Sequence, residues 1–345
     1  MQRLVRQPSA AARPGIPLLP PPGWRSVGVV TAVVAWLVAV PAVRAHGGPH
    51  LPPLDLSRAI TTWSFDPLAW GALLLGLLLY LAAVRRVDAR HPDSPVPRRR
   101  VAAWLAGLAV TAVALQSAID VYATTLFSVH MVQHMLLTLV AAPLLALGAP
   151  LTLLLRVSSR RVRRSLVLPL LHSRPVRVLA YPVVTWLLFT AVMWAAHFSP
   201  LFDAALEDEA VHVAEHVLFL AVGMLFWWPV VAADPVPWRM SFPARIAYLG
   251  LAFPQNTFLG LAIFSAPRPL YPHYATLERA WGPDALADQQ LAGGLMWAGG
   301  DLLFFVPLIL LVAAWLRSEE ERGRSIDRRL DQQRDQQLDR AAPPR

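Results

Sequence analysis

Residues 67–84 read PLAWGALLLGLLLYLAAV, and Arg85 and Arg86 follow directly. An uninterrupted apolar run with charge at its end is typical of a helix that crosses a bilayer, which needs about 20 such residues. The chain of 345 residues is 56% hydrophobic and only 15% charged, and this composition is too apolar for an ordinary soluble domain. The sequence therefore predicts an all-α fold, a polytopic bundle of transmembrane helices.

Apolar segments of similar character recur along the chain and predict seven spans. The predicted spans are residues 67–84, 101–121, 130–155, 178–197, 210–232, 246–265 and 290–316. Another apolar segment, near residues 27–44, is interpreted as either a signal peptide or an additional N-terminal helix. The chain thus divides into a disordered basic N-terminus with this signal-like segment (1–45), a seven-helix membrane domain (46–316) and a charged tail (317–345).

Arginine is concentrated in alternate connections between the predicted spans. The loop after the first span, the loop after the third and the C-terminal tail are arginine-rich, whereas the loop after the fourth is acidic and contains Asp203, Glu207, Asp208 and Glu209. Because positively charged loops stay in the cytoplasm, we expect a multi-pass protein of the plasma (inner) membrane with a cytoplasmic C-terminus. The net charge of +9 is assigned to this orientation signal rather than to nucleic-acid binding, so the lipid bilayer is the expected surrounding.

Histidines gather at the outer ends of three predicted spans. His130 and His134 begin the third span, His212 and His216 begin the fifth, and His197 ends the fourth. Residues four apart share one face of a helix, so each pair presents two imidazoles on one side. Histidine is rare inside a bilayer without a function and is the commonest metal ligand. These five histidines are therefore the predicted metal ligands.

Cysteine is absent from the sequence, which excludes thiolate metal sites and iron–sulfur clusters. Methionine remains as a sulfur donor: Met131 and Met135 form a second pair four residues apart, and thioethers suit Cu(I). His46 would become the N-terminus if the preceding segment were cleaved after Ala45, and an N-terminal amine with an imidazole chelates Cu(II). Met131, Met135 and His46 are weaker ligand candidates than the five histidines.

Four acidic residues near or inside the predicted spans complete the candidate site. They are Asp120, Glu215, Asp288 and Asp301. A carboxylate in such a position faces the bundle interior and pairs with another group. We expect these side chains to support the ligand histidines and to fix their tautomers. For Asp301 a structural hydrogen bond between helices is the alternative, because the neighbouring glycines permit close helix contact.

Several of these motifs together resemble the CtaG family of cytochrome c oxidase assembly factors, named for the caa-type oxidases. The resemblance runs from residue 60 to residue 316 and is most specific between Asp120 and Pro150, where residues 127–135 read FSVHMVQHM. Also similar are His197, the run HVAEH at 212–216 and the run DQQL at 288–291. The resemblance implies a plasma-membrane protein that is needed to make an active heme-copper oxidase, with copper delivery or insertion as its part.

The expected function is that of a non-enzymatic assembly factor that binds copper at its outer face and passes it to cytochrome c oxidase subunits. Two alternatives stay open. His212 to His216 reads H-x-x-E-H, an inverted zinc-protease pattern, and in a metal-dependent hydrolase Glu215 would be the general base. In an electron-transfer protein, histidines on two facing helices would ligate heme axially.

Overall fold

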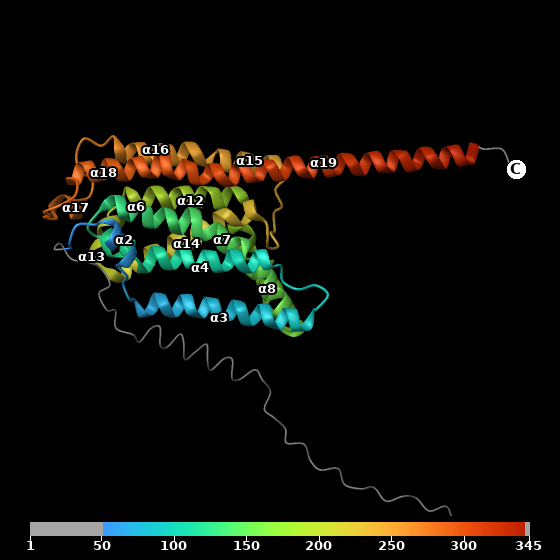
Figure 1. Ribbon diagram of the computed structural model, residues 1–345, viewed down its shortest axis with the longest axis horizontal. Coiled ribbons are helices and arrows are strands. Elements are labelled where there is room, and N and C mark those ends of the chain that lie inside the picture. The colour runs from blue at the N-terminus through green and yellow to red at the C-terminus, as the bar shows by residue number, and fades with distance from the viewer. Residues whose placement is uncertain (1–50, 342–345) are drawn as a thin grey trace, which may run out of the picture. The chain divides into compact units, whose positions relative to one another are not determined.

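The structure is a computed structural model that describes residues 51–341, and Figure 1 shows its helices. Within this range the chain is helical, without a β-strand. The signal-like segment and His46 lie outside the described residues. The α-helices and the π-helical turns (η) are, in chain order, α2 (Leu56–Thr61), α3 (Pro67–Arg90), α4 (Arg98–Gln116), α5 (Ala118–Ala123), α6 (Phe127–Met135), η1 (Leu136–Ala141), α7 (Ala142–Leu147), α8 (Pro150–Val157), α9 (Arg160–Val162), η2 (Arg163–Val167), α10 (Leu168–Leu171), α11 (Arg174–Leu179), α12 (Pro182–His197), α13 (Leu201–Glu207), α14 (Glu209–Val231), α15 (Phe242–Gly250), α16 (Ala252–Phe264), α17 (Pro272–Thr276), α18 (Ala285–Gly294), η3 (Leu295–Gly299) and α19 (Gly300–Ala341).

Five helical stretches of the described chain are long and apolar enough to cross a membrane. They are Pro67–Arg90, Phe127–Val157, Glu209–Val231, Phe242–Phe264 and Ala285–Arg334. Helices α12 and α13 make a sixth if this pair, bent by 65°, is one span. The predicted second span corresponds to α4, whose 19 residues begin with three arginines, and α4 does not belong to this set. The all-helical membrane fold is confirmed, and the count of seven spans stays a prediction.

The long helices lie side by side, and α6 and α14 lie near the centre of the bundle (Figure 1). Aromatic side chains of α12 and α14 fill the core there, including Phe189, Phe219 and Phe226. Helix α3 lies at the edge and buries only Tyr80 and Val87. The Tyr80 ring stacks on Trp104 with 4.6 Å between ring centroids. The apolar remainder of α3 is exposed or half-buried, as suits a helix with one face toward lipid.

Charge separates the two ends of the bundle. The arginine-rich end contains the end of α3, the start of α4 and the segment from α8 to α11 (Figure 1). The opposite end contains the start of α6, the end of α12, helix α13 and the start of α14, together with the acidic residues from Asp203 to Glu209. The five candidate histidines therefore lie at the end opposite to the arginine-rich end.

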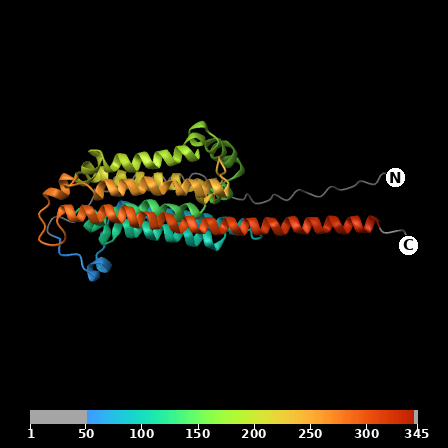
Figure 2. The ribbon, with the colours of Figure 1, turned by 90° about the horizontal axis from the view of Figure 1, so that it is seen from above.

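The predicted third span is interrupted twice. After α6 the backbone passes through the π-helical turn η1, and Pro143 follows in the first turn of α7. Proline has no N–H and its ring collides with the carbonyl four residues earlier, so the wider turn before it relieves the collision. The second break lies at Ala149, which adopts a left-handed conformation (φ 53°) before Pro150 begins α8. The C-terminal tail is not interrupted, since α19 continues from Gly300 to Ala341 without a break (Figure 2).

Helices α16 and α18 approach each other at two glycines. A Cβ atom on Gly293 would lie 2.6 Å from the backbone nitrogen of Phe264, and one on Gly260 would lie 2.9 Å from the backbone oxygen of Gly293. Such distances are shorter than any van der Waals contact, so no side chain fits at either position. This contact fixes α18, which in turn carries Asp288 to the start of α6.

Candidate metal centre

The five predicted ligand histidines lie together in the interior. Helix α6 supplies His130 and His134, α12 supplies His197, and α14 supplies His212 and His216. Each is at least nine-tenths buried. Ring centroids are 4.2 Å apart for His130 and His134, 4.2 Å for His212 and His216, 5.4 Å for His130 and His212, 6.1 Å for His134 and His216, and 6.2 Å for His134 and His197.

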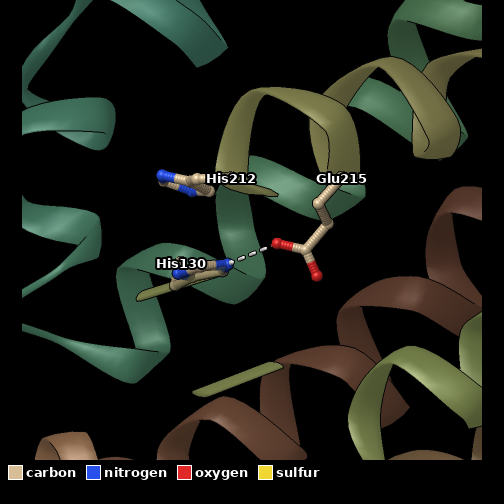
Figure 3. A group of neighbouring side chains, drawn as sticks. All are labelled: His130, His212 and Glu215. Atoms are coloured by element: carbon tan, nitrogen blue, oxygen red, sulfur yellow. Dashed lines mark ion pairs between the residues drawn. The ribbon is translucent and has the colours of Figure 1, made fainter. Parts of the chain in front are cut away.

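Glu215 points its carboxylate into this cluster. Its Oε2 atom lies 3.6 Å from Nε2 of His134 and 3.9 Å from Nε2 of His130. Among the described residues neither carboxylate oxygen has a hydrogen-bond partner. Figure 3 shows the carboxylate directed at His130, with the ring of His212 close by. Three buried residues, His130, His212 and Glu215, each offer one potential ligand atom. These three atoms lie within 4.8 Å of one another.

These separations suit a shared ion better than direct hydrogen bonds. Two ligand atoms at about 2.0 Å from one tetrahedral ion lie about 3.3 Å apart. The 3.6 Å and 3.9 Å distances from Glu215 are close to this value and exceed the usual length of a hydrogen bond. His130 and His134 are nearer, at 2.8 Å between their Nε2 atoms, which is the length of a bond that holds one proton between them.

Tyr274 in α17 determines which nitrogen of His130 faces the cluster. The Tyr274 hydroxyl donates to the backbone oxygen of Ala123 at 2.6 Å, and its oxygen lies 3.2 Å from Nδ1 of His130. Burial, with Asp288 nearby, raises the pKa of Tyr274 well above its ordinary value, so the hydroxyl keeps its one proton. Because that proton goes to a carbonyl, Nδ1 of His130 must be the donor, so Nε2 carries a lone pair and accepts the proton that it shares with Nε2 of His134.

Asp288 holds the start of α6. Its carboxylate accepts from the backbone N–H of Phe127 at 2.7 Å and of Ser128 at 3.3 Å, and Arg279 lies 3.6 Å away. A carboxylate at a helix N-terminus satisfies free N–H groups and complements the helix dipole. We expected Asp288 to support an imidazole, but these contacts are with the helix backbone. Asp288 therefore positions His130 by fixing the helix that carries it.

The other two acids differ in their contacts. Asp120 accepts from the amide of Gln133 at 3.0 Å and from the hydroxyl of Ser64 at 3.1 Å. Asp301 accepts from Asn256 at 2.9 Å and Thr257 at 2.7 Å, which joins α19 to α16. The structure thus places Asp301 in the interhelical hydrogen bond that the sequence offered as its alternative role.

A cavity of about 390 Å³ lies between α3, α4 and α14. Most of its wall is apolar, but one part carries titratable side chains: Asp66, Asp120, Glu209, His212 and His216. His212 and His216 thus border both this cavity and the histidine cluster. The wall of this cavity thus joins three carboxylates to two of the buried rings.

The two sulfur candidates, Met131 and Met135, lie next to His134 and His197. Nε2 of His197 lies 3.4 Å from the sulfur of Met131, and Met135 lines a small cavity with both residues. Three residues of this neighbourhood escaped prediction: Tyr274, Met193 and Met296. The sequence offered one indication for Tyr274, because it follows directly after a histidine, His273. Nothing distinguished Met193 or Met296 from methionines that only pack.

Proteins from three mycobacteria are similar to this chain. Uncharacterised proteins of Mycobacterium bovis and Mycobacterium tuberculosis are each 34% identical over 295 residues, and one of Mycobacterium leprae is 30% identical over 292. Each alignment covers 82% of this chain and 44% of the relative, so the chain spans less than half the length of these relatives. No solved structure gave a significant match.

The family comparison agrees with the motifs. The sequence profile of the cytochrome c oxidase caa3 assembly factors, Caa3_CtaG, matches residues 78–318. This range contains α4 to α18 and all five clustered histidines, Glu215 and Asp288. The chain belongs to the Caa3_CtaG family of cytochrome c oxidase caa3 assembly factors.

Proposed function

We propose that this protein is a non-enzymatic membrane assembly factor that binds copper at the histidine cluster and passes it to subunits of a heme-copper cytochrome c oxidase. The family supports the oxidase as partner. The observation that carries the copper part is the group of His130, His212 and Glu215, whose ligand atoms converge in the interior. In this proposal the histidine end faces the outside of the plasma membrane, and the arginine-rich end and the C-terminus face the cytoplasm.

The carboxylate of Glu215 supports a cation as the missing partner. Burying a polar group without a hydrogen bond is costly, and burying a charge more so. Glu215 is 3% exposed, its two oxygens accept no hydrogen bond from the described residues, and the nearest imidazole nitrogens are 3.6 Å and 3.9 Å away. A divalent ion among these groups would satisfy the carboxylate, and it would take the Nε2 lone pair of His130 in place of the proton shared with His134.

Copper fits the donors and the expected task. Imidazole and carboxylate bind Cu(II) more tightly than the other divalent ions of the first transition row. The path through the large cavity supports exchange, which a delivery site needs, because His212 and His216 line that cavity. Copper is here the cargo, and the oxidase subunit is the receiver.

The first experiment measures copper that stays with the protein. The full chain is purified in detergent, loaded with copper, washed, and analysed by mass spectrometry. We expect the double variant His130→Ala/His212→Ala to lose most of the retained copper. The matched control is His91→Ala/His172→Ala, because both histidines are exposed at the arginine-rich end. Equal copper in the two double variants would contradict the proposal, and a Soret absorption band in the purified protein would indicate heme instead.

Glu215→Gln separates the carrier from a hydrolase. In a hydrolase Glu215 would be the general base and would not bind the metal itself. In the carrier proposed here Glu215 is a ligand, because its carboxylate can reach the same ion as His130 and His212. We therefore expect Glu215→Gln to lower copper retention, with Glu207→Gln as the control, because Glu207 is exposed at the end of α13 and lines neither cavity. Full copper retention in Glu215→Gln would remove this residue from the ligand set.

A further inference from the structure

A second cavity, lined by methionines, lies next to the histidine cluster. It has a volume of about 30 Å³, enough for a single ion or water. Of the chain's seven methionines, four with described positions line it: Met131 and Met135 from α6, Met193 from α12 and Met296 from η3. His134 and His197 complete the polar part of the wall, with Gln255 and Asn256.

His197 turns a lone pair toward this cavity. Its Nδ1 lies 2.6 Å from the backbone oxygen of Met193. A carbonyl oxygen only accepts hydrogen bonds, so in the neutral ring Nδ1 carries the proton and Nε2 carries a lone pair. That Nε2 faces the sulfur of Met131 at 3.4 Å, and a thioether has no hydrogen to donate. Two electron-pair donors therefore face each other with no proton between them.

A metal ion satisfies both donors at the observed distance. With metal–nitrogen and metal–sulfur bonds of about 2.0 Å and about 2.3 Å, two ligands of a tetrahedral ion lie about 3.5 Å apart. The distance from Nε2 of His197 to the sulfur of Met131 is 3.4 Å. Both residues are almost fully buried, so bulk water does not take the place of the ion.

The ligand type selects the metal. Thioethers are soft donors that favour Cu(I), whereas carboxylates favour harder ions. The described residues that line this cavity include no aspartate or glutamate, while the neighbouring cluster contains Glu215. The flexible thioethers of Met135, Met193 and Met296 offer further sulfur atoms around the pair.

We propose that this cavity is a separate Cu(I) site, in which Nε2 of His197 and the sulfur of Met131 are the ligands and the other three methionines supply additional thioether contacts. His134 lies between the two sites, because it lines this cavity and its Nε2 is 2.8 Å from Nε2 of His130. The proposal deepens the proposed function, on which it rests, by adding a site specific for the reduced ion.

The test is Cu(I) binding by the full chain in detergent, under anaerobic reducing conditions, against a coloured Cu(I) chelator. X-ray absorption of the loaded protein reports whether sulfur scatters beside copper. We expect sulfur scattering in the wild type, and at least a tenfold loss of Cu(I) affinity in Met131→Leu and in Met296→Leu. The control is Met224→Leu, since Met224 packs against the same core but does not line the cavity. Methionine and leucine exchange with little change in volume, and thermal unfolding checks that each variant is folded.

The outcomes separate the two proposals. Absence of sulfur scattering, or equal affinities in Met131→Leu and Met224→Leu, would overturn the Cu(I) site. If copper were then still lost from His130→Ala/His212→Ala, the proposed function would stand without it. If sulfur scattering and Cu(I) affinity persisted in His130→Ala/His212→Ala while that variant retained as much Cu(II) as the wild type, the Cu(I) site would stand and the histidine centre would fall.

Discussion

The hydroxyl of Tyr274 shows how a single atom determines the tautomer of a candidate ligand. It accepts from Nδ1 of His130, so the ring's own proton is on Nδ1 and Nε2 carries the lone pair that a ligand atom needs. We predict that Tyr274→Phe weakens copper binding about tenfold, the lower end of the usual effect for a group that orients a ligand. The control is Tyr271→Phe, because Tyr271 donates to the backbone oxygen of His197 and not to a ring. A competition titration measures both, and equal affinities would remove Tyr274 from this role.

The sequence predicted which residues gather here but not which atoms face one another. The spacing of four placed His130 with His134 and His212 with His216, since helix geometry alone decides that. The tautomer of His130 depends instead on Tyr274, 144 residues away in the chain, and the start of α6 depends on Asp288, about 160 residues away. Such contacts arise from packing between distant segments, for which one sequence carries no local signal.

At the level of helices, the contact between α16 and α18 fixes the position of Asp288, which in turn holds the start of α6. We predict that Gly293→Ala lowers the thermal unfolding midpoint, because its new methyl group would meet the backbone of Phe264 and Gly260. Overpacking of this kind costs about 1–3 kcal/mol. Gly294→Ala is the matched control: its nearest neighbour is a side-chain atom at 3.9 Å, and alanine is the better helix former by about 1 kcal/mol. Equal midpoints in detergent would show that the close approach is not required.

The predicted helix boundaries agree with the structure where the length of the apolar segment alone determines them. The fifth span was predicted at 210–232 and α14 covers Glu209–Val231. The fourth span was predicted to begin at residue 178, but α11 ends at Leu179 and Pro182 begins α12. The bend of 65° into α13 and the π-helical turns also escaped prediction, because each depends on how a proline or a loop is accommodated by its neighbours.

For the whole molecule, the separation of charge predicts orientation. The chain has no cysteine, so a single introduced thiol is the only target for a maleimide. We predict that Glu207→Cys, exposed at the histidine end, is labelled in intact cells by a reagent that does not cross membranes. Asp93→Cys, exposed between α3 and α4 at the arginine-rich end, should react only after the cells are opened. The reverse pattern would place the histidine centre in the cytoplasm.

The π-helical turn η1 sets the rotational phase between two parts of one span. Such a turn holds one residue more than the α-helical path it replaces, and one residue corresponds to about 100° of rotation. In an unbroken α-helix, the side chains of Phe127–Met135 would therefore be rotated by about 100° relative to those of Ala142–Leu147, compared with their present directions. Deleting Val140 from η1 would restore the shorter path and rotate His130 and His134 out of register with α14, although every ligand would still be present in the chain. The assembly of the histidine cluster thus depends on the number of residues in a segment that contains none of its histidines.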